Sequence, residues 1–532
     1  MHLYSGMGAT SSLRGGAALG TALREHPDDL DAALDAWEAG LRPFITKNQR
    51  TARLRQQMFV PSGRGPRRCA RSSSVWAASS ATADWRRRPP HGRLRPCPAR
   101  RGDDEMVVRG TNGCAQDLPV TSLDAELIEL RREIHRRPEL AGEERETAGL
   151  VAEQLRAAGL EVTTGVGGHG VVAVLDGAAA GPTVAYRADM DAVDARRNVL
   201  PIPPSGRVFD EGFASRVPGV AHLCGHDLHT AIGVGVARDL ARRSEQVRGR
   251  LVFVFQPAEE PLRGARAMLG TGLVQRLAPR EFYALHCSPF PSGTIAVSPG
   301  YGLPGLDHLQ VVLPGGDDAA LAAVAAEVAE LGTVEFPRSV AAYHAHFTAL
   351  LEPGAAASIQ ESVSVSQWTG QTPDARPAVT VLLRVWPQER NRELRARVER
   401  IATAAGGHVE FAGDPFPALV NSAELSTAAG RYLGAALGPE SVLWGRASWP
   451  FNCEDFALFL DEAPGAQFYL GVADEESGIN GAPHAPDFAA DERAIGHGVR
   501  AMSGLLTHRL AALSDDPGPR GGSSPRRPRT PS

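Results

Sequence analysis

The stretch AHLCGHDLHTA, residues 221–231, holds one cysteine and three histidines within eleven positions. Thiolate and imidazole are ligands that zinc prefers, and imidazole also suits manganese. The alternative is a chance cluster in a partly buried loop, because a Cys-x-His pair such as Cys224 and His226 is not specific alone. A metal site at this stretch therefore requires further ligands from elsewhere in the chain.

Further acidic and imidazole side chains follow apolar runs that have the composition of buried strands. In open α/β sheets, ligand sites gather beyond the carboxyl ends of the strands. Adjacent glutamates in an extended chain diverge, so one can bind a metal while the other faces a substrate. The residues are Asp189 and Asp191 after VAYR, Glu259 and Glu260 after LVFVFQPA, His286 after FYAL, and His484 in the loop NGAPHAPDF.

The segments around these residues predict the scaffold that brings them together. Apolar residues at helical spacing predict two helices between residues 124 and 158, and Gly159 ends the second. The runs GVVAVLDG, TVAYRADMDA and GRLVFVFQPAEE predict strands, with a helix over 229–243 before the last of them. This alternation predicts an α/β fold with a mixed, largely parallel sheet and helices on both faces.

Composition and charge exclude several classes of protein. The 532 residues suggest two or three compact units, and a net charge of -5 provides no basic field for nucleic acid. No apolar run is long enough to span a membrane. The six cysteines are scattered without disulfide-like spacing, which favours a reducing compartment. We therefore expect a cytoplasmic protein with no nucleic-acid or membrane partner.

The two ends of the chain differ from the middle. Residues 1–63 resemble the C-terminal tail of a flavin-dependent aromatic hydroxylase, through a glycine-rich start and an AWE-x-x-LRP pattern over residues 36–43. Residues 64–118 are rich in arginine, proline and serine without a helical or strand period, which predicts a disordered junction. Residues 515–532 are predicted to form a disordered tail for the same reason.

Seven segments of the middle region resemble, in order, the binuclear metallo-aminoacylase and carboxypeptidase family. They are RREIHRRPEL, RADMDA, HLCGHDLHTA, FQPAEEPLRGARAML, LHCSP, NCEDFALFL and PHAPDF. The similarity is greatest to the amidohydrolase branch that includes hippurate hydrolase and auxin-conjugate hydrolase. It implies two divalent ions, Zn²⁺ or Mn²⁺, with Glu259 as general base one residue before the ligand glutamate. The implied metal ligands are Cys224, His226, Glu260, His286 and His484.

The chemistry of amide hydrolysis explains why such residues belong together. Two cations polarise the carbonyl and acidify a shared water, while a carboxylate takes its proton and returns it to the leaving nitrogen. We expect Asp189 to act with Glu259 in catalysis, and Asp189, Asp227 and Glu454 to support the ligands. Helix capping or surface solvation is the other interpretation of these three. The predicted substrate is an N-acyl amino acid or a similar small amide, with a metallo-dipeptidase or carboxypeptidase as the alternative.

The resemblance also implies a catalytic domain over 119–303 and 413–514, interrupted by an α+β lid over 304–412 through which a homodimer forms. The lid departs from the family pattern, because VVLPGGDDAALAAV (residues 311–324) contains no counterpart of the family's oxyanion-binding histidine. His344 or His346 of AAYHAHF, or Arg384, could replace it. A metal-binding protein with impaired catalysis is therefore a third hypothesis.

Overall fold

The computed structural model describes residues 121–204, 212–315, 318–353 and 360–515. The first helix, α3 (Ser122–Arg136), begins with a capping box in which Thr121 and Asp124 bind each other's backbone N–H groups. The predicted hydroxylase-like segment, the junction over 64–118 and nearly all of the C-terminal tail lie outside the described residues. None of the described helices is long and apolar enough to cross a membrane.

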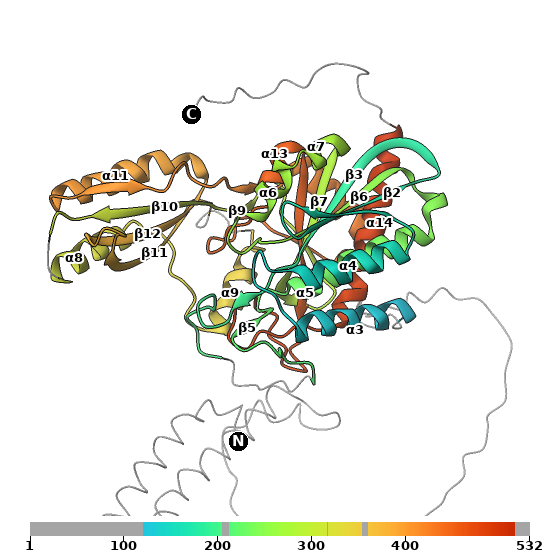
Figure 1. Ribbon diagram of the computed structural model, residues 1–532, viewed down its shortest axis with the longest axis horizontal. Helices are drawn as coiled ribbons and strands as arrows, with labels where there is room; N and C mark the ends of the chain where they lie inside the picture. Colours follow the sequence, from blue (N-terminus) through green and yellow to red (C-terminus); the bar gives the residue numbers. More distant parts are fainter. Residues whose placement is uncertain (1–120, 205–211, 316–317, 354–359, 516–532) are drawn as a thin grey trace, which may run out of the picture. The chain divides into compact units, whose positions relative to one another are not determined.

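A mixed eight-stranded sheet is the centre of the predicted catalytic domain, the catalytic part of the chain (Figure 1). The pairs β6–β3, β3–β7, β7–β16 and β8–β15 are parallel, and the remaining neighbours are antiparallel. The predicted fold class is thereby confirmed. In spatial order the strands are β1 (Glu161–Val166), β2 (Gly170–Asp176), β6 (Arg248–Gln256), β3 (Ala179–Asp189), β7 (Glu281–Pro291), β16 (Gly465–Ala473), β8 (Ile295–Val297) and β15 (Val442–Trp444).

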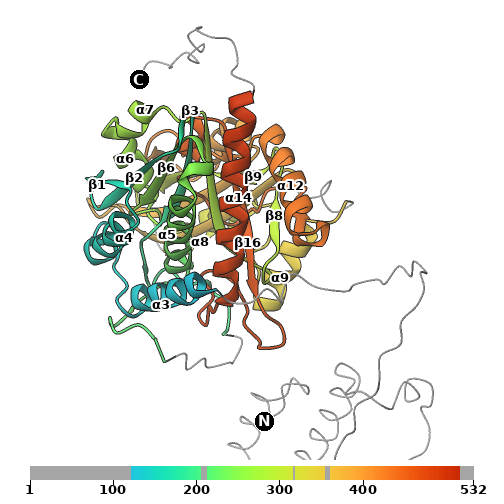
Figure 2. The same cartoon turned by 90° about the vertical axis from the view of Figure 1, so that its right-hand side faces the viewer.

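Alternate side chains of the central strands pack into two cores, one on each face of the sheet. On β6, Phe253 packs in the first core, whereas its neighbours Val252 and Val254 pack in the second. The strands are therefore apolar on both sides, as expected for a sheet covered on both faces. The helices that pack in the first core are α3, α4 (Arg145–Ala157), α5 (His226–Arg242), α12 (Ala423–Leu437) and α14 (Arg493–Asp515). Figure 2 shows α14 running beside α5. The helices that pack in the second core are α6 (Gly264–Gly270), α7 (Leu273–Leu277), α9 (Val340–Ala349) and α13 (Ala457–Glu462).

A second, four-stranded antiparallel sheet lies within the range predicted for the lid. Its order is β11 (Ser362–Gln371), β12 (Pro377–Trp386), β10 (Gly305–Val312) and β13 (His408–Phe411). Two helices, α8 (Asp318–Ala329) and α11 (Asn391–Ala404), pack on the apolar face of this sheet in a third core. Short two-residue strands form two further pairs, β4 (Val193–Asp194) with β5 (Val220–Ala221) and β9 (Gly302–Leu303) with β14 (Leu419–Val420).

One segment inside the predicted lid range does not pack with the lid sheet. The side chains of Tyr343, Phe347 and Leu350, on and just after α9, lie in the second core of the catalytic part. The ring of Phe347 stacks on that of Trp449 with their centroids 3.9 Å apart. The sequence between α8 and β11 thus returns to the catalytic part before the lid sheet resumes.

A chain that begins at Leu118 is expected to fold and to bind metal as the full chain does. The reason is that residues 121–515 by themselves supply three large apolar cores. The measurement is the thermal unfolding midpoint and the metal content of the truncated chain beside the full chain. Loss of soluble, metal-loaded protein on truncation would show that residues 1–117 stabilise the described part.

Candidate metal centre and active site

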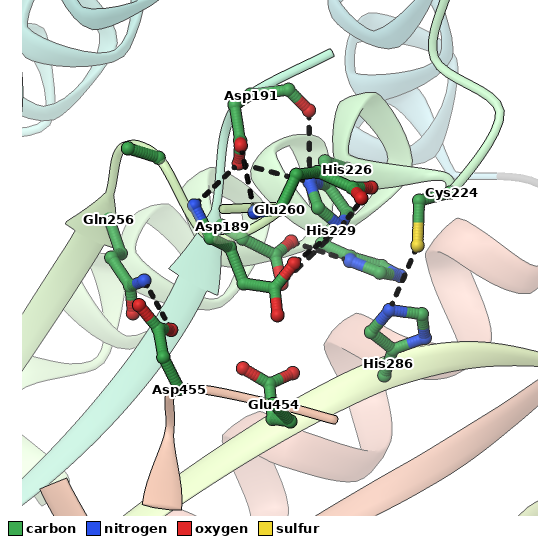
Figure 3. A network of polar contacts seen from close by, with 12 residues as sticks. Asp189, Asp191, Cys224, His226, His229, Gln256, Glu260, His286, Glu454 and Asp455 are labelled. Atoms are coloured by element: carbon green, nitrogen blue, oxygen red, sulfur yellow. Dashed lines mark hydrogen bonds and ion pairs between the residues drawn. The ribbon is translucent and has the colours of Figure 1, made fainter. Parts of the chain in front are cut away.

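The ends of three neighbouring strands bring the predicted residues to one edge of the sheet (Figure 3). Strand β3 ends at Asp189, β6 ends three residues before Glu259, and β7 carries His286. The strands are adjacent and parallel in the order β6, β3, β7, so their carboxyl ends lie together. Helix α5 begins at His226 beside them.

A glycine turn directs Cys224 and His226 toward the same point. Gly225 has a φ of 84°, a left-handed conformation that other residues rarely adopt. A Cβ atom at this position would lie 2.6 Å from Sγ of Cys287, so the space also requires glycine. With this turn, donor atoms of Cys224, His226 and Glu260 lie within 4.8 Å of one another.

Three histidines are oriented through their Nδ1 atoms. Nδ1 of His226 lies 2.9 Å from the carbonyl oxygen of Asp191, Nδ1 of His286 lies 2.8 Å from that of Cys287, and Nδ1 of His484 lies 3.2 Å from that of Asn198. A carbonyl oxygen only accepts hydrogen bonds, so each Nδ1 carries a proton and each Nε2 is the ring atom left to bind a metal ion. Metal-binding histidines are commonly held in this way.

The side-chain atoms that could bind a metal are separated by the distances expected between ligands of one cation. Oε1 of Glu260 lies 3.4 Å from Nε2 of His484 and 3.9 Å from Nε2 of His226. Sγ of Cys224 lies 3.4 Å from Nε2 of His286. Metal–ligand bonds of about 2.0–2.3 Å at tetrahedral angles require separations of this order. Nε2 of His226 and Oε1 of Glu260 are buried and have no hydrogen-bond partner among the described residues, which a cation would supply.

Charge at the cluster also favours a cation. Burial lowers the pKa of His226, but Asp189, Asp191 and Glu260 outweigh burial and raise it to about 10. Burial and the nearby Glu260 raise the pKa of the Cys224 thiol well above its usual value. A bound divalent ion would lower the pKa of this thiol and stabilise the thiolate. The residues present therefore fit a metal ion.

The adjacent glutamates are fixed by two other carboxylates. Oδ1 of Asp191 accepts a hydrogen bond from the backbone N–H of Glu259 at 3.1 Å, and its Oδ2 accepts one from Glu260 at 3.0 Å. The preceding Ala258 has a φ of 51°, and its N–H donates to Oε1 of Glu144 at 2.8 Å. This held turn leaves both side chains near His226, whose Nε2 lies 3.9 Å from Oε2 of Glu259 and 3.9 Å from Oε1 of Glu260.

Glu259 has the environment of a proton acceptor. Its Oε2 lies 3.9 Å from Nε2 of His226, and its side chain borders the same cavity as the candidate ligands. Burial, together with the charges of Glu454, Glu260 and Asp455, raises the pKa of Glu259 well above its usual value. A carboxylate of raised pKa accepts a proton readily near neutral pH.

Arg187 holds the carboxylates on the other side of Glu259. Its guanidinium is 2% exposed and lies 2.6 Å from Asp189, 3.0 Å from Glu454 and 3.3 Å from Asp455. Glu259, Glu454 and Asp455 in turn approach one another within 4.8 Å. Arg187 therefore compensates a group of carboxylates that would repel one another without it.

Arg187→Met is expected to destabilise the fold by about 3–5 kcal/mol, because it leaves buried carboxylates without their counter-ion. Urea unfolding at neutral pH measures the change. Arg250→Met is the matched control, since Arg250 also lies on a strand and pairs with Asp176, but its side chain is 43% exposed. That exposed pair is expected to contribute about 0–1 kcal/mol. Equal losses in the two variants would contradict the assigned role of Arg187.

His229 is a buried member of the site whose role the sequence did not reveal. Its Nδ1 lies 2.6 Å from Oδ1 of Asp189, and its Nε2 accepts a hydrogen bond from the N–H of Cys287 at 2.8 Å. Both ring nitrogens are thus occupied, which leaves His229 no lone pair for a metal. His229 lies one helical turn after His226, and this spacing is the sequence feature that could have identified it as part of the site.

Asp189 contacts other residues of the site rather than bordering the cavity itself. Besides His229, its carboxylate binds Arg187, and Oδ2 lies 3.8 Å from Nε2 of His226. Burial alone would raise the pKa of Asp189, but His226, Arg187 and His229 lower it well below its usual value. Asp189 therefore stays ionised beside the cluster, where it orients His229.

Asp227 is neither a helix cap nor a solvated surface residue. The residue that caps α5 is Gly225, and Asp227 is completely buried. Its carboxylate accepts a hydrogen bond from Arg131 at 2.7 Å and lies 2.8 Å from Nδ1 of His135. These contacts tie the start of α5, and with it His226, to α3. Glu454, bound to Arg187, is likewise buried.

A cavity of about 490 Å³ opens on the cluster. Cys224, Glu259, Glu260, His286 and His484 contribute to its wall, together with aromatic side chains and residues of the lid sheet. Arg384 of β12, one of the candidates for an oxyanion partner, is among these lid residues. The cluster is thus accessible to a small organic molecule.

The two histidines considered as replacements for the lid histidine do not border this cavity. Nε2 of His344 is 2.7 Å from the carbonyl oxygen of Asn480, on the other side of α9. His346 contacts the rings of Trp449 and Phe451 edge-on. Neither histidine is placed to replace the lid histidine in this cavity, to which α9 contributes Tyr343 and Phe347 instead.

Comparison with known proteins identifies the family to which the sequence is similar. A model of Peptidase family M20/M25/M40 matches residues 185–508. The chain is 30% identical over 407 residues to thermostable carboxypeptidase 1 of Saccharolobus solfataricus, covering 74% of this chain and 96% of that protein. It is 30% identical over 385 residues to N-acetylcysteine deacetylase of Bacillus subtilis, covering 69% and 93%.

A solved structure resembles the chain as well. The YXEP protein of Bacillus subtilis, described as a dinuclear metal binding peptidase from the M20 family, aligns with a TM-score of 0.53 and 26% identity. The alignment covers 73% of this chain and 99% of that one. The hydroxylase-like segment predicted for residues 1–63 receives no support from these matches.

Proposed function

The chain belongs to Peptidase family M20/M25/M40, and from this premise we propose that it hydrolyses the amide bond of an N-acyl amino acid or a similar small amide. One observation carries the proposal. Three histidines have Nδ1 tied to carbonyl oxygens and Nε2 free beside Cys224 and Glu260, next to a buried glutamate of raised pKa. Ligands for cations and a proton acceptor thus border one cavity.

Two divalent cations, Zn²⁺ or Mn²⁺, would be held by Cys224, His226, Glu260, His286 and His484. Such ions make the carbonyl carbon more electrophilic and the attacking water more acidic. Thiolate and imidazole favour zinc, whereas imidazole with carboxylate also accepts manganese.

In this proposal Glu259 takes a proton from the water as its oxygen bonds to the carbonyl carbon. It then gives that proton to the amide nitrogen as the C–N bond breaks. Asp189, with Arg187 and His229, keeps the neighbouring groups in position, and Asp191 holds the backbone that carries both glutamates. The lid sheet completes the cavity through residues such as Arg384.

The reaction on a dipeptide or a C-terminal peptide bond is a second candidate. It is favoured by the 30% identity to thermostable carboxypeptidase 1. The deacetylase of similar identity favours the N-acyl amino acid. We further propose that the chain acts in the cytoplasm and forms a homodimer through the lid sheet.

The test is hydrolysis of a panel of N-acyl amino acids, dipeptides and simple amides by purified protein, with and without a chelator. Activity on N-acyl amino acids that the chelator removes and Zn²⁺ or Mn²⁺ restores is the expected result. Preferential cleavage of dipeptides would favour the second candidate. Stoichiometric metal binding without turnover on any member would contradict both and favour a binding protein with impaired catalysis.

A further inference from the structure

Helix α9 contributes an aromatic pair to the wall of the candidate active site. Tyr343 and Phe347 are one helical turn apart, so they lie on the same face of α9. The ring of Tyr343 meets that of Trp449 edge-on at 5.0 Å and lies 5.2 Å from that of Phe347. Only 2% of Tyr343 is exposed. Its ring is therefore held on two sides by packing.

Tyr343 contributes to the wall of the cavity on which the candidate metal centre opens. Tyr343 borders the same cavity as Cys224, Glu259 and His286. Burial, with contributions from Cys224, Cys287 and Tyr469, raises the pKa of its hydroxyl well above the usual value. Among the described residues the hydroxyl has no hydrogen-bond partner. The cavity wall thus contains a neutral O–H group beside a candidate ligand, with its proton free to donate.

Amide hydrolysis requires a hydrogen-bond donor near the carbonyl oxygen of the substrate. As the water oxygen bonds to the carbonyl carbon, the π electrons move onto the carbonyl oxygen, which becomes an oxyanion. A donor fixed in advance near that oxygen stabilises the transition state more than the substrate. Neither His344 nor His346 borders the cavity, so neither can provide this hydrogen bond.

We propose that the hydroxyl of Tyr343 donates a hydrogen bond to the carbonyl oxygen of the bound amide as this oxygen becomes an oxyanion. The proposal rests on the proposed function. Tyr343 keeps its proton throughout: Glu259 accepts the proton of the water and passes it to the leaving nitrogen, and the electrons of the oxyanion restore the carbonyl as the C–N bond breaks. Tyr343 is then a catalytic residue, because it touches a reacting atom.

The test compares Tyr343→Phe with the unchanged protein on the best amide of the panel. The variant keeps the ring between Trp449 and Phe347 and loses only the donor. We expect kcat to fall by about 10²- to 10³-fold with little change in KM, since the hydrogen bond forms mainly in the transition state. Metal content should not change.

A binding measurement supports the kinetic one. A phosphinate analogue of the tetrahedral intermediate should bind Tyr343→Phe about 10²-fold more weakly, whereas the carboxylate product should bind it as before. Tyr186→Phe is the matched control, because the Tyr186 hydroxyl is also buried and unpartnered but does not border the cavity. It should leave kcat and phosphinate affinity unchanged.

The outcomes separate this inference from the proposed function. If the unchanged protein cleaves an amide and Tyr343→Phe keeps both its kcat and its phosphinate affinity, the role of Tyr343 is refuted and the proposed function stands. Equal losses of substrate, product and phosphinate affinity would also refute it, because they indicate a packing role. If no amide is cleaved, the proposed function fails, and unequal phosphinate affinities of the two proteins would still support a donor at residue 343.

Discussion

Glu259→Gln is expected to keep the fold and the bound metal while kcat falls by about 10²- to 10⁴-fold. Glutamine has the shape of glutamate, so the hydrogen bond from its backbone N–H to Asp191 is preserved. Its amide oxygen cannot take the proton of the attacking water at neutral pH. Steady-state kinetics with metal analysis of the same sample measures the effect.

The charges around Glu259 also predict how the Glu259→Gln substitution changes the thermal stability of the protein. The charges of Glu454, Glu260 and Asp455, together with burial, raise the pKa of Glu259, so its ionised form is unfavourable in the folded state. A neutral amide removes that repulsion, and the thermal unfolding midpoint should stay the same or rise. A fall in activity accompanied by a lower midpoint would point to structural damage rather than to loss of a base.

Glu260→Gln is the control for Glu259→Gln, because both side chains approach Nε2 of His226 but Glu260 also approaches a second candidate ligand. Oε1 of Glu260 lies 3.4 Å from Nε2 of His484, within the candidate ligand group. This variant should lose metal affinity, and added metal should restore part of its activity. Full activity of Glu259→Gln on a cleaved substrate would show that the base has been assigned to the wrong residue.

The sheet could be predicted because its strands are apolar on both faces and follow one another with helices between them. Apolar runs such as LVFVF identify β6 without reference to any partner strand. The position of α9 could not be predicted in this way. Its sequence lies between two lid elements, and only the contacts of Tyr343 and Phe347 with Trp449, about a hundred residues later, bring it to the catalytic part.

In the candidate site, too, the residue types could be predicted from the sequence but their contacts could not. Cysteine, histidine and glutamate at strand ends are visible as metal-binding types. The structure brings four of the five predicted ligands to the wall of one cavity, and the fifth, His226, lies within 4.8 Å of Cys224 and Glu260. The partners of these residues are not visible, since their roles depend on pairs far apart in the sequence. Arg187, for example, is an ordinary strand residue until β3 meets the loop that carries Glu454 and Asp455.

His226→Ala is expected to have the largest effect on metal binding. Nε2 of His226 is completely buried and unpartnered, and it lies 3.8–3.9 Å from carboxylate oxygens of Asp189, Glu259 and Glu260. Changing an outer partner of a metal ligand typically costs 10- to 100-fold in affinity, so loss of the ligand itself should cost at least about 100-fold. The metal content should fall from about two ions per chain, and kcat with it.

The control is His497→Ala, which removes a buried histidine of α14 that is not part of the candidate ligand group. Its metal content should equal that of the unchanged protein. Metal content is measured after reconstitution and dialysis, with circular dichroism to verify folding. Since Nε2 of His226 faces three carboxylates, its loss also leaves them with less compensating charge, and the variant should unfold at a lower temperature than the control. A folded His226→Ala chain that still retains about two ions would remove His226 from the ligand set.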